Sequence, residues 1–291
     1  MNILYIHTHD TGRYIQPYGY AIPTPNLQRM AEQGTIFRQC FNAGPTCSPS
    51  RAALLTGQYP HVCGMLGLAH RGFSLNDYSK HLAGYLTRNG FESVLCGVQH
   101  VTRHDRKDVL GYSRIIMGQD VPWDELKAQW DQEGLSEEHK GAARSMAQDR
   151  SNARAVVAYL KEKKDKPFFL SFGMGSTHRP YAKADPDINP DYMQPPAPVH
   201  DNAETRRDMA EFATRARCVD DCVGLVLDTL RETGLDRDTF VFFTTDHGIA
   251  FPRMKCHLYD PGIGVALIVD YPGNPAAGTA GVAHGSLPDT L

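Results

Sequence analysis

The chain has 291 residues, of which 41% are hydrophobic and 22% are charged, and its formal net charge at pH 7 is −3. This is the composition of a globular chain with enough residues for one large domain or two modest ones. The slightly acidic balance and the lack of any Lys/Arg run argue against nucleic-acid binding, and no apolar stretch has the length of a transmembrane helix. We therefore expect neither a nucleic acid nor a membrane as a partner.

The first segment, residues 2–8, is a continuous apolar run that is typical of a central strand in a parallel sheet. No secretory signal precedes it, so we expect a cytoplasmic protein, or a periplasmic one if a leader was removed. The seven cysteines are scattered and form no C-x2-C pair, which argues against a zinc knuckle and favours a reduced compartment. Cys218 and Cys222 fall on a predicted helix, where we interpret them as core thiols.

The first strand is followed by His9 and Asp10. In open α/β sheets, ligands gather outside the carboxyl ends of the strands, so these two side chains stand where a metal site would form. Taken alone, an aspartate in this position is more often a turn residue. A helix over 24–34 and a second strand over 35–41 then lead the chain to Cys47.

Residues 45–57 predict a loop that turns into a short helix, with Ser48 as cap, Pro49 at the first helical position and Gly57 as stop. Cys47 would then lie just ahead of a helix N-terminus, beside the positive charge of Arg51. Both features lower the pKa of a thiol and make it reactive. The plainer alternative is a buried cysteine before an ordinary helix.

The run Cys-Ser-Pro-Ser-Arg at 47–51, followed by Ala-Ala-Leu-Leu-Thr-Gly, resembles the signature of the type I sulfatases. In that family the cysteine is oxidised to formylglycine, whose hydrate attacks the sulfur of a sulfate ester. The spacing argues against a tyrosine phosphatase loop, which places five residues between its Cys and Arg. The resemblance implies that a formylglycine-generating enzyme matures Cys47.

Further along the chain, a helix is predicted over 78–89 and a strand over 91–97, which leads to His100. The family has Gly-Lys-x-His at this point, so His100 matches the residue that stabilises the nucleophile, while Val98 replaces a sulfate-binding lysine. Arg103 and Lys255 are candidates to replace that charge. Residues 101–147 are polar and are predicted to be an insertion that shapes a substrate pocket.

A helix over 151–164 and a buried strand over 167–173 precede His178, which lies before a Pro turn and suits a general acid. The resemblance implies the same role, because the family has a His-x-Pro turn whose histidine contacts the sulfate and protonates the leaving group. A long helix over 204–233 and a strand over 239–245 then lead to Asp246 and His247.

Three separate strands thus deliver His9 and Asp10, the Cys47 loop, and Asp246 and His247 to one edge. The resemblance implies one divalent cation there, with calcium expected first and magnesium or manganese as alternatives. His9 replaces the first of two adjacent acids that the family carries, and imidazole is a softer ligand than carboxylate. The implied metal set is His9, Asp10, Cys47, Asp246 and His247.

The closing segment, 251–262, resembles the family's last active-site loop, in which Lys255 matches a sulfate-binding cation. One more strand is predicted over 264–271, and the tail only loosely resembles the family's next helix. Alternating strands and helices predict an α/β sandwich around a mostly parallel sheet. The resemblance specifies an alkaline-phosphatase-like three-layer sandwich. We interpret 1–291 as one catalytic domain in which the usual C-terminal subdomain is largely absent.

The predicted function is hydrolysis of a sulfate ester or sulfamate on a small sulfated saccharide or aryl sulfate, similar to bacterial heparan N-sulfatase-like enzymes. The implied catalytic residues are Cys47, Arg51, His100, His178 and Lys255. Two alternatives stay open: a phosphonate monoester or phosphodiester hydrolase of the same superfamily, and a degenerate sulfatase-like binding protein. A homo-oligomer is also compatible with the sequence.

Overall fold

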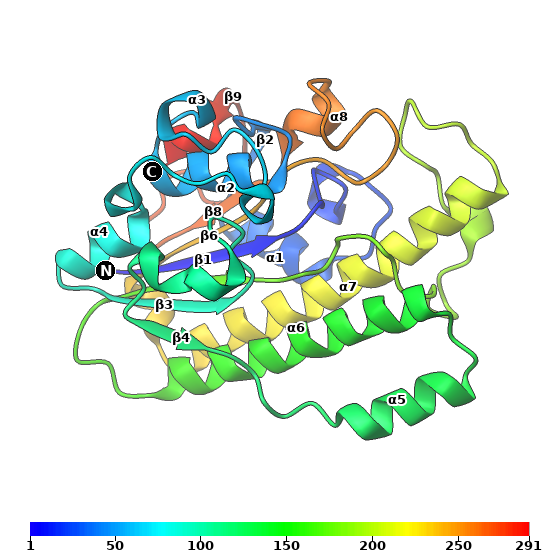
Figure 1. Ribbon diagram of the computed structural model, residues 1–291, viewed down its shortest axis with the longest axis horizontal. Helices are drawn as coiled ribbons and strands as arrows, with labels where there is room; N and C mark the ends of the chain where they lie inside the picture. The colour runs from blue at the N-terminus through cyan, green and yellow to red at the C-terminus, as the bar shows by residue number, and fades with distance from the viewer. Residues whose placement is uncertain (291) are drawn as a thin grey trace.

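The fold is built on a mixed sheet that crosses the whole molecule (Figure 1). The computed structural model describes residues 1–290, and in this part of the chain the sheet has nine strands in the order β4-β3-β5-β1-β6-β8-β2-β7, with β9 paired to β2. Their bounds are β1 Asn2–Thr8, β2 Thr35–Phe41, β3 Glu92–Gly97, β4 Arg114–Ile116, β5 Phe168–Gly173, β6 Thr239–Thr245, β7 Gly264–Val265, β8 Leu267–Asp270 and β9 Thr279–Ser286.

The five strands from β4 to β6 run parallel, and β8 is antiparallel to both β6 and β2. The carboxyl ends of β3, β5, β1 and β6 therefore meet at one edge of the sheet. Gly97 at the end of β3 is required there, because its φ is +84° and a Cβ would lie 2.0 Å from the carbonyl oxygen of Gly173 on β5.

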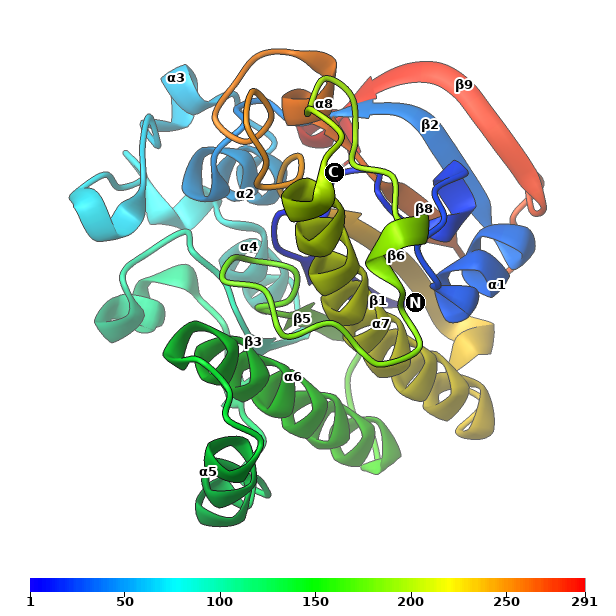
Figure 2. The ribbon, with the colours of Figure 1, turned by 90° about the vertical axis from the view of Figure 1, so that its right-hand side faces the viewer.

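Helices cover both faces of the sheet, which gives three layers (Figures 1 and 2). Strand residues alternate between two cores, as expected for a pleated strand buried on both sides. Leu4 and Ile6 of β1 pack with the helices of one face, whereas Tyr5 packs with those of the other. The first face carries α1 Pro25–Gln33, α6 Glu137–Lys161 and α7 Ala203–Glu232; the second carries α2 Cys47–Thr56 and α4 Leu82–Arg88.

The predicted start of α1 is confirmed, but its cap comes from elsewhere. Thr24 makes no side-chain cap. The carboxylate of Asp220 on α7 instead accepts hydrogen bonds from the backbone N–H groups of Asn26 and Leu27 at 3.0 and 2.8 Å. This bond joins α1 to α7 and satisfies donors that a helix start leaves free.

Three predicted elements have different bounds in the structure. The helix predicted over 78–89 is divided at His81 into a 3-10 turn, Tyr78–Lys80, and α4. The helix predicted over 151–164 begins much earlier, because α6 starts at Glu137. The strand predicted over 264–271 is interrupted at Ala266 into β7 and β8, whose partners lie on different parts of β2.

The segment interpreted as an insertion, 101–147, contains a 3-10 segment (His104–Leu110), β4, α5 (Trp123–Gln132) and the first turns of α6. Figures 1 and 2 show α5 standing off the body of the molecule. Short helices α3 (Pro60–Cys63) and α8 (Asp260–Ile263) complete the set, and a 3-10 turn, Leu287–Thr290, follows β9. The predicted domain end, Leu291, lies outside the described residues. Among the helices that the structure describes, none is both long and apolar enough to span a bilayer.

Candidate active site

The site lies where the parallel strands end and α2 begins. Cys47 is the first residue of α2, which begins two positions earlier than expected, and Thr46 precedes it in an extended conformation. Ser48 does not cap the helix, because its Oγ accepts a hydrogen bond from the backbone N–H of Ala69 at 3.0 Å. Gly57 ends the helix in the left-handed conformation, as predicted. The thiol is therefore presented at a helix N-terminus, where the dipole favours a negative group.

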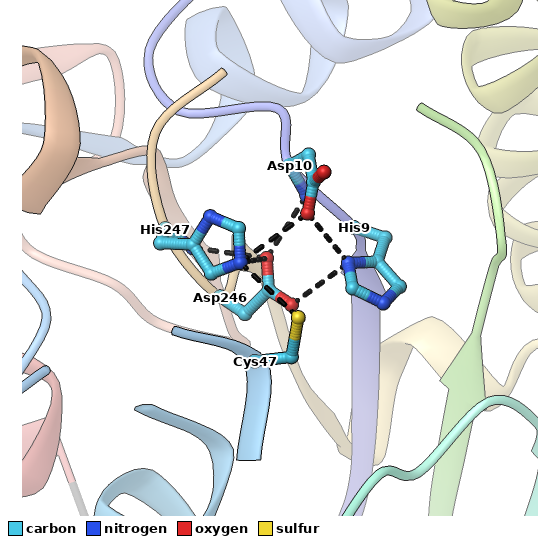
Figure 3. Close-up of side chains that lie close together, drawn as sticks. All are labelled: His9, Asp10, Cys47, Asp246 and His247. Carbon is cyan, nitrogen blue, oxygen red and sulfur yellow. Dashed lines mark hydrogen bonds and ion pairs between the residues drawn. The ribbon is translucent and has the colours of Figure 1, made fainter. Parts of the chain in front are cut away.

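Five buried side chains from three segments converge on one point (Figure 3). His9 and Asp10 follow β1, Asp246 and His247 follow β6, and Cys47 opens α2. One donor atom from each lies within 4.8 Å of all the others. The backbone turn that aims Asp10 has a φ of +57°, a strained value for a non-glycine residue, and the Asp10 N–H donates to the Asp246 carboxylate at 2.9 Å.

Positive charge is favoured between the two carboxylates. His9 Nδ1 lies 2.8 Å from Asp10 Oδ1 and 3.0 Å from Asp246 Oδ2. Burial alone would lower the pKa of His9, but Asp246 and Asp10 raise it well above its ordinary value. Burial likewise opposes ionisation of Asp10, yet His9 and His247 hold the pKa of that carboxyl below its usual range. His247 Nε2 completes the ring at 3.2 Å from Asp10 Oδ1.

The thiol of Cys47 lies against the histidines of this cluster. Its Sγ lies 3.4 Å from His247 Nε2, and the residue is 5% exposed. Burial raises the pKa of the thiol, but hydrogen bonds to His100, His247 and His9 outweigh that effect and lower the pKa to about 3. These contacts favour the thiolate of Cys47, which is the reactive form.

Arg51 is fully buried under the cluster. Its Nε and one terminal nitrogen contact Asp246 Oδ2 at 3.1 and 3.0 Å, and the same terminal nitrogen donates to the Thr8 carbonyl at 2.7 Å. The other terminal nitrogen contacts His7, whose Nε2 lies 3.2 Å from Ser171 Oγ on β5. The guanidinium is therefore held by β1 and the Asp246 turn, and it fixes the start of α2 against the sheet.

The remaining predicted residues surround the same point. Lys255 Nζ donates to Asp10 Oδ2 at 2.7 Å and lies 3.3 Å from His178 Nε2. His100 Nδ1 lies 3.1 Å from His9 Nε2, and the rings of His9 and His178 meet edge to face at 4.5 Å. Every residue predicted for the site is thus brought to it, although the chemical role of each stays a prediction.

Arg103 and Lys255 are the two candidates to supply the positive charge that is missing at Val98, and the structure distinguishes between them. Lys255 lies in the cluster, as just described. Arg103 is exposed and pairs with Asp105 in its own loop at 3.1 Å. Only Lys255 of these two is in contact with the carboxylates.

Two residues that support the His178 loop were missed by the sequence prediction. Asp149 on α6 accepts hydrogen bonds from the N–H groups of Gly175 and Ser176, both at 2.9 Å. Arg215 on α7 donates to the Pro180 carbonyl at 2.9 Å and to Ser176 Oγ at 3.2 Å. A signal was present, because Arg215 lies on the same apolar stripe of the helix as Val219 and Cys222, where a charged residue must have a specific partner.

Two cavities open beside the cluster. One of about 250 Å³ is lined by His9, His100 and His178. The second, of about 430 Å³, lies between the segment after β3 and helix α6, and it shares Val98, His100, Ser145 and Gly175 with the first. The cavities therefore leave room beside Cys47 for a ligand that extends beyond the cluster itself.

The donor set fits the divalent cation that the resemblance implies. Two carboxylates, two imidazoles and a thiol offer ligand atoms that converge on one point, and the two carboxylates that raise the pKa of His9 favour positive charge there. Imidazole and thiolate suit first-row transition ions, while carboxylate also suits calcium and magnesium.

Comparison with known proteins gives consistent relatives. The profile of one protein family, described as Sulfatase, matches residues 1–286. The human N-sulphoglucosamine sulphohydrolase is 30% identical over 297 residues, which cover 92% of this chain and 55% of that protein. This chain spans about half the length of the curated relatives that it matches.

Solved structures share the fold. A phosphonate monoester hydrolase from Silicibacter pomeroyi superposes with a TM-score of 0.78 at 18% identity, covering 99% of this chain and 71% of that one. A protein in complex with its substrate D-glucosamine-2-N,6-O-disulfate superposes with a TM-score of 0.69 at 16% identity, covering 99% and 74%. At these identities the likeness establishes the three-layer α/β fold.

Proposed function

The chain belongs to the sulfatase family, and from this premise we propose that it hydrolyses a sulfate ester or sulfamate through a formylglycine derived from Cys47. The observation that carries the proposal is the position of Cys47. Its sulfur is held at the first turn of α2, inside a buried group of two carboxylates, two imidazoles and two fixed cations. Formylglycine at this position would supply, as its hydrate, an oxygen nucleophile.

The cation would be held by His9, Asp10, Asp246 and His247, with the residue-47 side chain beside them. When bound, it would polarise the sulfate and balance its charge. Calcium is the identity that the family implies, whereas the pair of imidazoles favours manganese.

The two cationic side chains, Arg51 and Lys255, have different roles: Arg51 positions the site, and Lys255 binds the sulfate. Arg51 keeps Asp246 and the start of α2 in place, and Lys255 adds a positive charge at the open side of the cluster. Fixed charges of this kind are worth most when they face the charge that develops in the transition state. Lys255 thereby takes over from the lysine that Val98 replaces.

His178 is the proposed general acid. Its side chain is 43% exposed, in contrast to the buried ligands, and it lines the smaller cavity beside the cluster. Burial and the neighbouring charges of His9 and Lys255 lower its pKa, while Asp10 opposes them and favours the protonated form that a general acid needs. His100, in contact with His9, would hold a proton beside the nucleophile.

The proposed substrate is a small sulfated saccharide or aryl sulfate. The names of the relatives support a saccharide, because one is a sulphohydrolase of N-sulphoglucosamine and another protein of this fold binds a disulfated glucosamine. Maturation requires a formylglycine-generating enzyme as a partner. A homo-oligomer and a cytoplasmic location remain proposals.

Mass measurement of the peptide that spans Cys47, on protein from the native host, tests the proposal together with sulfate release from 4-nitrophenyl sulfate. We expect an aldehyde mass and cation-dependent release. An unmodified thiol without release, in a host that modifies other sulfatases, would contradict the enzyme and leave the binding-protein alternative. Faster turnover of a phenylphosphonate monoester than of any sulfate would instead assign the phosphonate hydrolase activity.

A further inference from the structure

The larger cavity next to the cluster has a charge distribution that the proposed sulfate chemistry does not use. It measures about 430 Å³, within the range of small-molecule sites. Its lining includes four basic side chains away from the cluster: His70, Arg103, His104 and Lys107. The only acidic residue among the described lining residues is Asp149, whose two oxygens are already bonded to the N–H groups of Gly175 and Ser176.

Lys107 is the basic residue best placed to bind a ligand. It is half-buried on the 3-10 segment between β3 and β4, and within the described part of the chain it has no hydrogen-bond or ion-pair partner. Burial lowers its pKa, and among the described residues no carboxylate offsets that effect. Arg103, by contrast, is paired with Asp105. A half-buried ammonium without a counter-ion is a position at which an anion would replace lost solvation.

The cavity also has apolar lining residues. Ile115, Ile116 and Met117, on β4 and just after it, line it, and Ile115 and Met117 are about half exposed. Such a surface suits the C–H face of a sugar ring. The cavity thus combines apolar and cationic lining residues, and it shares Val98 and His100 with the smaller cavity at the cluster.

We propose that this cavity binds the leaving-group sugar and that Lys107 binds a second anionic group on it, a sulfate or a carboxylate. The inference rests on the proposed function for the location of the first sulfate. It assigns the substrate as a saccharide with at least two negative groups, of which one is cleaved at residue 47 and the other stays on the released sugar. In the ribbon, this places the sugar between the β3–β4 connection and α6 (Figure 1).

Binding in the absence of turnover provides the test. In the full-length Cys47→Ala protein, which has no nucleophile, calorimetry would compare D-glucosamine 2-N-sulfate with D-glucosamine 2-N,6-O-disulfate. We expect the disulfate to bind roughly tenfold more tightly, as a charge-assisted contact would give. Adding Lys107→Met should remove this advantage and leave the monosulfate affinity unchanged, while Lys107→Arg should retain it.

A third ligand separates the two sources of the second charge: N-sulfated glucosamine linked to glucuronic acid carries a carboxylate in place of the second sulfate. Lys163→Met, which removes an exposed lysine distant from the cavity lining, is the matched control and should change no affinity. Equal affinities for all three ligands, or an advantage that survives Lys107→Met, would overturn the inference. Lys107-dependent binding without turnover by the mature enzyme would support the pocket and count against the proposed hydrolysis instead.

Discussion

His9 is the residue at which this site departs most clearly from the sulfatase pattern, and the departure changes the chemistry of the donor set. A carboxylate at this position would place three acids around the cation. The imidazole instead bonds to both Asp10 and Asp246, each of which also faces a fixed cation, Lys255 or Arg51. Compared with a site that has a carboxylate at this position, this site has fewer anionic oxygen ligands and one more nitrogen ligand. It should therefore prefer hard ions such as calcium less strongly over transition ions such as manganese.

A His9→Asp substitution should therefore shift ion preference toward calcium. After incubation of the protein with equimolar Ca²⁺ and Mn²⁺ and removal of free ions, elemental analysis would give the bound ratio. We expect the calcium-to-manganese ratio to rise by roughly tenfold over the wild type, since an oxygen ligand replaces a nitrogen. His61→Asp, at an exposed histidine away from the cluster, is the control. An unchanged ratio would mean that His9 is not a ligand.

Lys255 leads to a second prediction at the residue scale. It contacts Asp10 and His178 from the open side of the cluster, so its removal should weaken transition-state binding more than folding. For Lys255→Met we expect kcat/KM on an aryl sulfate to fall about 100-fold, the magnitude typical of one lost charge-stabilising group. Lys80→Met, on an exposed turn, serves as the control, and a full rate in Lys255→Met would remove Lys255 from the mechanism.

At the scale of elements, side chains from the long helices α6 and α7 hold the loops and helix starts next to the site in place. Asp149 on α6 and Arg215 on α7 hold the His178 loop, and Asp220 on α7 caps α1. On the face of the sheet that carries α2 and α4, His81 also caps a helix, in this case its own. This fully buried residue is the N-cap of α4, and its Nδ1 accepts a hydrogen bond from the Ala83 N–H at 3.3 Å.

His81 gives a pH dependence of stability whose sign can be stated. Burial lowers its pKa from 6.5 to about 4, so the folded state binds this proton less readily than the unfolded state. Its stabilising contribution is complete above pH 6.5 and is lost as the pH falls toward 4. Between pH 7.5 and 5 the loss amounts to about 2 kcal/mol of the free energy of unfolding.

Urea denaturation at these two pH values would measure the effect. His81→Asn keeps a good N-cap residue and cannot titrate, so it should lose about 2 kcal/mol less than the wild type on acidification. His70→Asn changes an exposed histidine and should behave as the wild type does. Equal pH dependence in all three proteins would show that His81 does not titrate in this range.

At the scale of the whole molecule, the candidate cation site links segments that are far apart in the sequence. Asp10 follows β1, Cys47 opens α2 and Asp246 follows β6, so a cation bound by all three segments binds the folded state and not the unfolded chain. Ligand binding of this kind raises the free energy of unfolding.

Thermal unfolding should therefore depend on the cation. With free ion at a thousandfold excess over Kd, the added stability is about 4 kcal/mol, which corresponds to a rise in Tm on the order of 10 °C for a chain of this size. A chelator should reverse the shift, and Asp246→Asn should abolish it. A Tm that is independent of added Ca²⁺ and Mn²⁺ would argue against a cation that bridges these strands.

The sequence alone determined the order of the strands along the chain and which residues follow their carboxyl ends, because apolar runs and the turn residues after them are local signals. This was sufficient to predict β1, β2, β3, β5 and β6 closely, and to predict His9, Asp10, Cys47, Asp246 and His247 as one group. The long Cys47 motif added the family.

The tertiary structure decided what depends on contacts between distant segments. It placed Lys255 rather than Arg103 at the carboxylates, replaced the expected Ser48 and Thr24 caps with other bonds, and extended α6 back to Glu137. It also revealed Asp149 and Arg215, and it showed that Lys107 has no partner among the residues that the structure describes. The local sequence around a charged residue is similar whether the side chain is exposed to water or bonded to a buried partner. Only the packing of the chain distinguishes these two environments.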